Sequence, residues 1–445
     1  MTRFTEARSK PVWVWLPDAL EPVRAGVFTW KPGLGRFKYD EAYRALGHSI
    51  ALDPLHLPWT RKDKGANETA NQGVFGVFRD ASPEGFGLAL LERKIGQSLD
   101  ELDRLEHAPG DAVGAIDIAD DLTQKLAWRP PTLERLAEAL VQLPPTRADG
   151  AAAREVAGLP GTSVGGERPK ITVESEGHWW IAKLQDRADI AHYPAREYVA
   201  MQLASQCGIG AAVTRFHRAG EREFIAVLRF DRSPIDEAAH AGTAKTGASM
   251  ARHGFASAHT VLHLGRGEVR GDLARTYPAL AHELRRWCGL GNQFILPMQR
   301  ELWRRMAFNA LIGNGDDHPR NHAVVYRHGR WGLSPAYDVV PHPKHGGTLA
   351  MGITPEGDAI VNESNLLRAC SHFGYDEEDA RLDLQIMASR VLDGYESVLR
   401  ETGFECADIP DLADSFALAR ELGGRPQGRS FVPSWERSLS SVKDE

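Results

Sequence analysis

Three polar residues between positions 308 and 341 have the types and the spacing that phosphoryl transfer requires. Asp316 and Asn321 stand five positions apart, as in the D-x-x-x-x-N catalytic loop of protein kinases, and Asp338 follows them. In such a loop the Asp accepts the proton of the attacking hydroxyl, and the Asn binds a magnesium ion. Two carboxylates and one amide oxygen are hard ligands that suit Mg²⁺ held partly by substrate phosphates. The segment therefore predicts a magnesium-dependent phosphotransfer site.

Two other interpretations of this segment remain open. Asp316 and Asp317 could be turn formers, as Asp after Gly commonly is, and Asp338 could merely cap a turn before Pro341. His318 and His322 have the i, i+4 spacing of the zinc-binding pair in H-E-x-x-H helices. Pro319 lies between them and the Glu is missing, so a helical zinc pair would require His318 to be a helix cap. We therefore favour the phosphotransfer interpretation and place His318 at the nucleotide site.

A lysine and a glutamate further upstream support the same chemistry. Lys183 lies near the end of the strand-like run HWWIAKL, and Glu197 lies on the helix expected after it. In kinases, the lysine that contacts the α and β phosphates is on a strand of the nucleotide-binding lobe, and a glutamate of a following helix orients it. Without the segment around Asp316, both would be ordinary surface residues of a strand end and a first helical turn.

Two runs of sequence could bind the nucleotide itself. The run GTSVGGERPK, residues 161–170, has glycines whose backbone N–H groups could approach phosphate oxygens, although a flexible linker is the alternative. The run FIAVLRFDRS, residues 224–233, should end a strand where backbone groups can pair with adenine, with core packing as the alternative for its apolar residues. The predicted nucleotide contacts are Ser163, Val164, Gly165, Gly166, Lys183, Leu228, Phe230, Asp231, His318, Asn321 and Asp338.

Short strands and a long helical region must position these residues. Residues 12–58 are β-rich, and a turn around Ser82 begins a helix that is expected to run through Ile95. Apolar residues recur mostly at helical spacing from Thr260 onward, apart from a hairpin expected just before Asp338. The other expected elements are a helix at 133–143, strands at 170–173, 178–184 and 223–230, and a helix at 195–207.

These patterns predict an α+β protein with two kinase-like lobes, a small β-rich N-terminal subdomain and a mainly helical C-terminal lobe. The chain of 445 residues is too long for one hydrophobic core, which agrees with several packed units. The expected divisions are a β-rich subdomain with helices at 1–145, a nucleotide-binding lobe at 146–235 and a helical catalytic lobe at 236–445.

Composition excludes several other classes of protein. The net charge of −7 gives no electrostatic reason for the whole chain to bind nucleic acid or an anionic membrane. The four cysteines are far apart and form no C-x-x-C pair, so neither a zinc ribbon nor a disulfide framework is expected. No apolar run approaches the ~20 residues that a membrane helix needs. We therefore expect a cytoplasmic protein without a membrane partner.

The motifs described above resemble those of one known family. The segments SVGGERPK, IAKL, REYVAMQLA, RFDR, GNGDDHPRNH and SPAYDVVP occur in the order seen in HipA-type toxin kinases, and GVFRDASPEG resembles their leading domain. The likeness covers roughly residues 12–400. It implies that Asp316 is the catalytic base and that Asn321 and Asp338 hold Mg²⁺. It also implies that Lys183 contacts the phosphates of ATP and that Glu197 orients Lys183.

The resemblance further implies how such a protein would work. Residues 163–166 would form a flexible phosphate loop in which Ser163 can be autophosphorylated. The partners would be a small helix-turn-helix antitoxin of the HipB type, operator DNA bound only through that antitoxin, and a protein substrate such as an aminoacyl-tRNA synthetase. The residues around Glu167 and the region 235–270 depart from the family pattern, so the target is open. A small-molecule kinase and a corepressor subunit remain the alternatives.

Overall fold

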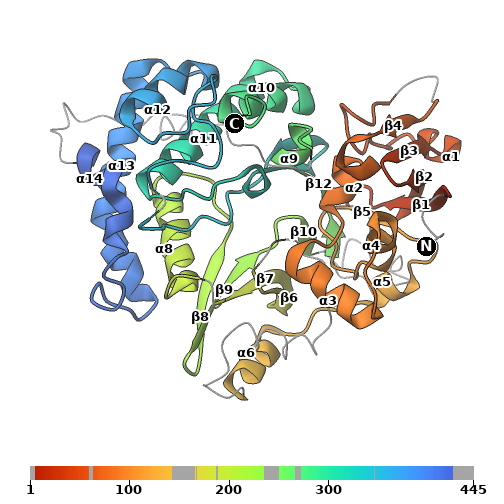
Figure 1. Cartoon of the computed structure of the whole chain (residues 1–445), viewed down its shortest axis with the longest axis horizontal. Coiled ribbons are helices and arrows are strands. Elements are labelled where there is room, and N and C mark those ends of the chain that lie inside the picture. Colours follow the sequence, from red (N-terminus) through yellow and green to blue (C-terminus); the bar gives the residue numbers. More distant parts are fainter. Residues whose placement is uncertain are drawn as a thin grey trace. The chain divides into compact units, whose positions relative to one another are not determined.

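The computed structural model describes most of the chain as two compact units (Figure 1). The first comprises Met1–Asp189, Arg218–Glu268 and Ala323–Ser334, and the second comprises Ile190–His217, Val269–His322 and Pro335–Glu445. The described residues are 6–59, 64–142, 166, 168–186, 189–234, 250–265, 272–344 and 346–423. Each unit is built from separate stretches of the chain, so neither corresponds to one continuous segment of sequence.

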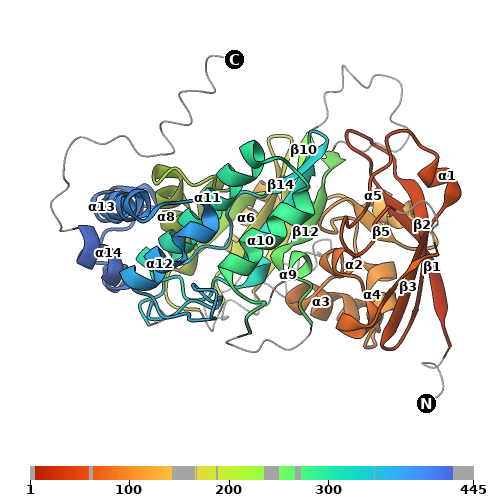
Figure 2. The same cartoon turned by 90° about the horizontal axis from the view of Figure 1, so that it is seen from above.

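The first unit begins with an antiparallel sheet of strand order β4-β3-β2-β1-β5. Its strands are β1 (Arg8–Val14), β2 (Val23–Lys31), β3 (Leu34–Tyr39), β4 (Ala66–Glu68) and β5 (Ile116–Ile118). Figure 2 shows the helices α2 (Gly76–Asp80), α3 (Gly85–Ile95) and α4 (Glu101–His107) on one face of this sheet. The ring of Phe78 on α2 packs edge to face against the rings of Phe28 on β2 and Phe37 on β3. The expected β-rich leading region is confirmed.

Local sequence signals explain how these helices begin and end. The Asp100 side chain accepts hydrogen bonds from the backbone N–H groups of Leu102 and Asp103 and so caps α4. Helix α3 ends at Gly96, whose φ of 82° lies in the left-handed region that glycine adopts without strain. The helix expected to run through Ile95 is therefore confirmed. The remaining short elements here are α1 (Glu41–Arg44), the 3₁₀ turn η1 (Ala70–Gly73) and α5 (Thr123–Ala127).

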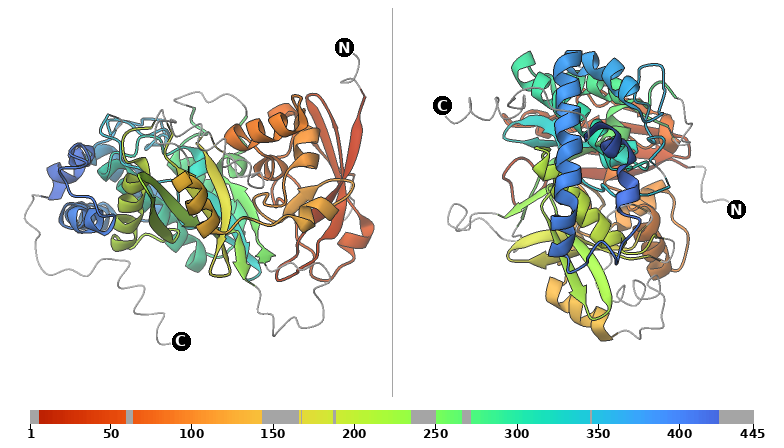
Figure 3. Two further views of the ribbon diagram at one scale, coloured as in Figure 1. Left: turned by 90° about the horizontal axis from the view of Figure 1, so that it is seen from below. Right: turned by 90° about the vertical axis from the view of Figure 1, so that its left-hand side faces the viewer.

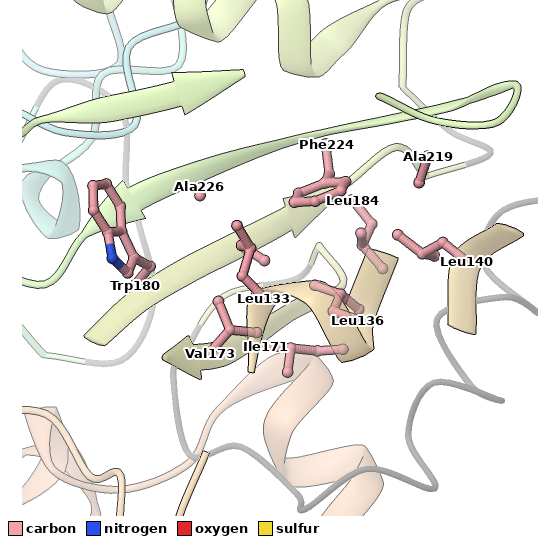
Figure 4. Packing of buried hydrophobic residues seen from close by; sticks show 11 residues of the cluster. Leu133, Leu136, Leu140, Ile171, Val173, Trp180, Leu184, Ala219, Phe224 and Ala226 are labelled. Carbon is pink, nitrogen blue, oxygen red and sulfur yellow. The ribbon is translucent and has the colours of Figure 1, made fainter. Parts of the chain in front are cut away.

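A second sheet, whose strands lie mainly in the first unit, has the strand order β6-β7-β9-β8. Its strands are β6 (Lys170–Ser175), β7 (His178–Leu184), β8 (Thr214–Ala219) and β9 (Arg222–Leu228). Helix α6 (Leu133–Gln142) covers one face, where Leu133 and Leu136 pack against Ile171 and Val173 (Figure 4). The expected strands and the helix at 133–143 are confirmed, except that β9 ends two residues before Phe230.

The predicted hairpin before Asp338 is confirmed and belongs to the first unit. Strands β13 (Ala323–Arg327) and β14 (Arg330–Leu333) pair as expected. A third strand that the sequence did not reveal, β12 (Gly254–Ser257), pairs with the outer side of β13. Helix α9 (Ala258–Val261) follows β12, and β10 (Arg232–Pro234) pairs with β11 (Met250–Arg252). These strands interrupt the helical pattern that apolar spacing predicts for the C-terminal half.

The second unit is built mainly from helices, as expected. They are α8 (Tyr193–Gln206), α10 (Tyr277–Cys288), α11 (Asn292–Leu311), α12 (Glu363–Ala369), α13 (Glu377–Glu401) and α14 (Ala417–Gly423), with the 3₁₀ turns η2 (Pro319–Asn321), η3 (Cys370–Phe373) and η4 (Ala413–Phe416). The long helix α13, seen along its length in the right-hand view of Figure 3, packs against α8, α11 and α14. Among the described residues, no helix is long and apolar enough to cross a membrane.

Candidate active site

The loop that follows α11 exposes Asp316 and is closed by Asn321. The chain turns at Gly313, whose φ is 69° and where an added Cβ atom would come within 2.7 Å of the Ser415 carbonyl oxygen. The Asn321 side-chain N–H₂ donates to the Asp316 carbonyl oxygen at 3.2 Å, which leaves the amide oxygen of Asn321 as an acceptor. The Asp316 residue itself is exposed, while Asn321 is 6% exposed. The structure therefore brings these two predicted site residues together.

Asp317, the neighbour of Asp316, is buried and accepts three side-chain hydrogen bonds. Its Oδ2 atom accepts from the Asn309 amide at 2.7 Å and from the Tyr277 hydroxyl, and the His322 Nε2 atom lies 2.9 Å away. Burial, followed by the adjacent negative charge of Asp317, raises the pKa of Tyr277 well above its usual value, so the phenol remains a donor. Asp317 thus ties the loop to α10 and α11.

Sequence reasoning missed this role of Asp317. A turn-forming Asp was the alternative considered for the Asp-Asp pair, and Asp317 does not turn the chain by itself but anchors it. No local signal could have identified Tyr277 as a partner, since it lies 40 positions away on another helix.

The two histidines of the loop do not form the zinc pair that their spacing allowed. His318 precedes the 3₁₀ turn η2, and His322 follows it with extended backbone angles. The His322 ring is directed to Asp317. Within the part of the chain that the structure describes, no group of three or more His, Cys, Asp or Glu side chains is arranged to hold a metal ion. A zinc centre at this loop is therefore not supported.

Asp338 lies on a segment that is fastened to the same loop. The Tyr337 hydroxyl donates to the Arg320 carbonyl oxygen at 2.7 Å, which links the residue before Asp338 to the residue before Asn321. Asp338 has a φ of 59°, a left-handed conformation that Asp tolerates better than most residues. On the other side, the Ala336 N–H donates to the Gly210 carbonyl oxygen at 2.8 Å. The second unit therefore holds the segments of Asp316, Asn321 and Asp338 side by side.

In the first unit, Lys183 shares one sheet face with a second lysine. Lys170 stands directly opposite Lys183 across the antiparallel β6–β7 pair, and the two are 9% and 8% exposed. Residues paired in this way project from the same face. That face is opposite the one that α6 covers, because Ala182 and Leu184 alternate with Lys183 and pack toward α6. Two ammonium groups side by side make this face suited to an anion.

Gly166, the described end of the predicted phosphate loop, lies beside Lys170. Its φ is 113°, and an added Cβ atom would lie 2.5 Å from the Lys170 Nζ atom. Its carbonyl oxygen accepts from the Phe86 N–H at 2.9 Å, which fastens this end of the loop to the start of α3. Ser163, Val164 and Gly165, the other predicted members of the loop, lie outside the described residues.

The predicted adenine-edge residues have other contacts in the first unit. The Leu228 side chain packs toward α6, on the sheet face opposite that of Lys183. The Phe230 ring stacks on Phe255 with ring centres 6.3 Å apart, and the Phe230 carbonyl oxygen accepts from the Arg327 guanidinium. Contacts of Leu228 and Phe230 with a nucleotide therefore stay predictions that would involve mainly backbone groups.

Asp231 lies in a buried cluster of ion pairs. Its carboxylate accepts from Arg229 and Arg232 at 2.7 Å each and from the Gly114 N–H at 2.9 Å. Although burial disfavours the charge, these two guanidinium groups hold the pKa of Asp231 far below its usual range. Its lone pairs are thus largely occupied, so this geometry disfavours the predicted contact of Asp231 with ATP.

The same cluster joins the five-stranded sheet to the β10–β11 pair. Arg252 donates to Asp117 of β5 and to the Gly114 carbonyl oxygen at 2.9 Å, and Lys125 lies 2.9 Å from the other Asp117 oxygen. Arg229 also donates to the Asp111 carbonyl oxygen at 2.9 Å. Sequence reasoning did not identify Arg252, because its acidic partner Asp117 lies 135 positions away.

Glu197 is fully buried on α8 of the second unit, whereas Lys183 belongs to the first unit. Their predicted pairing stays a prediction.

Comparison with known proteins adds a family assignment to this geometry. Residues 162–394 match the model of the HipA-like C-terminal domain, and residues 14–119 match that of the HipA N-terminal domain. The first of these covers about half of the chain by itself. No curated protein matches the sequence.

Solved structures agree with the fold. The structure titled as the Shewanella oneidensis MR-1 toxin–antitoxin system HipA, HipB and operator DNA complex is similar over 94% of this chain and 100% of that one. The identity is 16% and the TM-score 0.63, so the likeness shows a shared fold. The Helicobacter pylori proinflammatory kinase CtkA matches 57% of this chain and 93% of its own at 11% identity. Its TM-score of 0.33 is too low to support an argument.

Proposed function

The chain belongs to the HipA family of kinase-like toxins, and from this premise we propose that it is an ATP- and Mg²⁺-dependent protein serine/threonine kinase of a toxin–antitoxin module. The observation that carries the proposal is the loop of the second unit. Asp316 is exposed on this loop. The Asn321 side chain donates a hydrogen bond to the Asp316 carbonyl oxygen, and buried Asp317 accepts one from Asn309 of α11. A catalytic base must reach its substrate and be held rigidly, and this loop meets both requirements.

Each remaining group has a part in this reaction. Asp316 would accept the proton of the attacking hydroxyl, and the Asn321 amide oxygen and the Asp338 carboxylate would hold Mg²⁺. The fit is supported because Asn321 donates through its nitrogen and because the Tyr337–Arg320 hydrogen bond links the two segments. Bound Mg²⁺ would neutralise charge on the phosphates during transfer. Lys183 would contact those phosphates, and Glu197 would orient Lys183.

The proposed acceptor is a protein of translation, such as an aminoacyl-tRNA synthetase, and family membership is its support. The decisive experiment is phosphoproteomics of cells that express the parent chain or its Asp316→Asn variant. We expect a small set of serine or threonine sites to be phosphorylated with the parent chain only. If the parent chain phosphorylates metabolites in a lysate but no protein, the acceptor is a small molecule instead.

The proposed partner is a helix-turn-helix antitoxin of the HipB type. It is supported by the related Shewanella structure, which is described as a complex of HipA, HipB and operator DNA. The net charge of −7 disfavours direct DNA binding, so we propose that operator DNA is bound only through the antitoxin. Gel-shift titrations should detect operator binding by the chain together with the antitoxin and none by the chain alone.

We also propose that Ser163 is autophosphorylated. A phosphate adds about −1.5 to −2 charges at neutral pH, which would repel ATP phosphates from the adjacent glycines. Mass spectrometry should then find phosphate on Ser163 in the parent chain after incubation with ATP and Mg²⁺, and none in Asp316→Asn.

A further inference from the structure

Two neighbours of Glu197 on helix α8 are held by the C-terminal part of the second unit. Arg196 is only 1% exposed, and its guanidinium group forms an ion pair with Asp411. The Tyr198 hydroxyl donates to the Glu401 carboxylate at 2.8 Å. Burial, followed by the hydrogen bond to Glu401, raises the pKa of Tyr198 to about 12, so this phenol stays protonated and donates. Glu197 itself lies between these two residues and is completely buried.

The start of α8 is contacted by the same C-terminal segment. The His192 ring lies against Phe404 with ring centres 4.4 Å apart, and His192 has a φ of 58° at the residue that precedes the helix. Arg196 additionally donates to the Ala191 carbonyl oxygen at 2.9 Å, so its guanidinium joins the helix entry to Asp411. Residues 401–411 therefore contact the first turns of α8 at three side chains.

The rest of α8 packs closely on the helix that precedes this segment. At Gly394 of α13, an added Cβ atom would lie 2.6 Å from the Gln206 side chain and 3.1 Å from that of Leu203. The Arg390 guanidinium donates to the Gln206 carbonyl oxygen at 2.8 Å. The C-terminal end of α8 is thus fixed through α13, and its N-terminal end through residues 401–411.

Because of helical geometry, the contacts of Arg196 and Tyr198 also fix the direction in which Glu197 projects. Consecutive side chains of an α-helix project about 100° apart around its axis. Arg196 and Tyr198 therefore project on either side of Glu197, and holding both of them prevents rotation of the helix about its axis. A rotation of α8 about its axis would change the direction in which the buried Glu197 side chain projects.

We propose that residues 401–411, through Asp411 and Glu401, fix the orientation of α8 and thereby position Glu197. This inference rests on the proposed function, because Glu197 acts there by orienting Lys183. The segment lies beyond residue 394, where the match to the HipA-like C-terminal domain ends. Asp411 and Glu401 are positioning residues, since each would act through its contact with α8.

The test compares Asp411→Ala with Asp408→Ala in the full-length chain. Asp408 is an exposed neighbour that accepts from the Glu405 N–H within its own turn. We expect Asp411→Ala to raise the KM for ATP and lower kcat, with kcat/KM falling about 3- to 30-fold, as for a coupling of roughly 0.5–2 kcal/mol. Asp411→Glu should restore most of the loss. Asp408→Ala should match the parent chain.

A double variant separates positioning from a general loss of structure. In the Glu197→Gln background, Asp411→Ala should cause little additional loss, because the residue through which it acts is already altered. If the two losses multiply in full, Asp411 acts elsewhere and the inference is wrong. It is also wrong if Asp411→Ala leaves the KM for ATP and kcat unchanged.

A measurement without turnover distinguishes failure of this inference from failure of the proposed function. Amide hydrogen exchange over residues 193–206 should be faster in Asp411→Ala than in the parent chain or Asp408→Ala. A parent chain that transfers no phosphate to protein or metabolite would contradict the proposed function. Unchanged exchange in Asp411→Ala would contradict the positioning by this segment, whatever the activity of the parent chain.

Discussion

The loop around Asp316 and the cluster around Asp231 both place aspartates at sequence motifs, but they use them differently. In the loop, the exposed Asp316 precedes the buried Asp317, whose partners Tyr277, Asn309 and His322 are uncharged or titratable donors. In the cluster, Asp231 is buried between two permanently charged guanidinium groups. The hydrogen bonds from Tyr277 and Asn309 to Asp317 hold the loop while its neighbour Asp316 stays exposed. The ion pairs of Asp231, in contrast, belong to a cluster that joins two sheets. Accessibility, and not residue type, therefore separates Asp316, the proposed catalytic base, from the buried aspartates Asp231 and Asp317.

The largest expected effect is on turnover and comes from Asp316→Asn. Because Asp316 is exposed and would accept the substrate proton, its loss should lower kcat about 100- to 10,000-fold. Its unfolding free energy should change by less than about 0.5 kcal/mol, as at other exposed positions. Phosphate-transfer kinetics and chemical denaturation check the two halves. A loss of turnover below tenfold would show that Asp316 is not the base.

Asp231→Ala should cause the largest loss of stability. It would leave Arg229 and Arg232 buried without their shared carboxylate, and breaking such a pair costs about 3–5 kcal/mol. The surface ion pair of Arg24 and Asp40, 2.8 Å long, provides the control, since Asp40→Ala should cost less than about 1 kcal/mol. Urea denaturation monitored by tryptophan fluorescence measures both. Equal values for the two variants would contradict the structural role of Asp231.

The Asp231 pair also predicts acid sensitivity. Since the folded-state pKa of Asp231 lies far below the unfolded value of about 3.9, its contribution is complete above roughly pH 5 and declines as the pH falls below about 4. The unfolding free energy of Asp231→Ala should therefore depend less on pH below pH 4 than that of the parent chain. A variant with the same acid dependence as the parent would show that other carboxylates dominate.

Asp317→Ala should lower the free energy of unfolding by about 2–3 kcal/mol, which is less than the loss expected for Asp231→Ala. The reason is that it leaves the Tyr277 and Asn309 donors without an acceptor, whereas Asp231→Ala leaves buried charges without a partner. Asp317→Ala should also reduce turnover, since the loop that carries Asp316 loses its anchor. Asp317→Asn keeps one acceptor oxygen and should recover part of both losses. Denaturation midpoints and phosphate-transfer kinetics, measured on the same samples, check both effects. If Asp317→Ala were as stable as Asp316→Asn, the anchoring role of Asp317 would be contradicted.

The smallest effect concerns His253, at the edge of the Asp231 cluster. Burial, followed by the nearby Arg327, lowers the pKa of His253 from about 6.5 to about 4. The unfolded chain then binds more protons between these values, so stability should fall as the pH drops from 6.5 to 4. Because His253 is partly exposed, the change should be only about 1 kcal/mol. His253→Gln should flatten the stability profile in this range, and an unchanged profile would assign the dependence to other groups.

Much of the local structure of this chain follows from its sequence alone. Strand β7 occurs where the strand-like run HWWIAKL predicts it, and α6 and the β13–β14 hairpin agree to within a residue or two. Asp316 and Asn321 could be paired from spacing because a short Gly- and Pro-rich loop leaves few conformations. Each of these features depends on residues close together in the chain, so periodicity and turn-forming residues are sufficient to predict them.

Tertiary structure alone decided which polar residues are buried against distant partners and which stay exposed. The Gly114 N–H that binds Asp231 lies 117 positions away, and the Glu401 that binds Tyr198 lies 203 positions away. Strand β12 could not be predicted either, because it is defined by pairing with β13, about 70 positions later. Local patterns carry no information about such partners. Burial and the surrounding charges, which depend on distant segments meeting, place Asp231 in a buried cluster of ion pairs and leave Asp316, the proposed base, exposed.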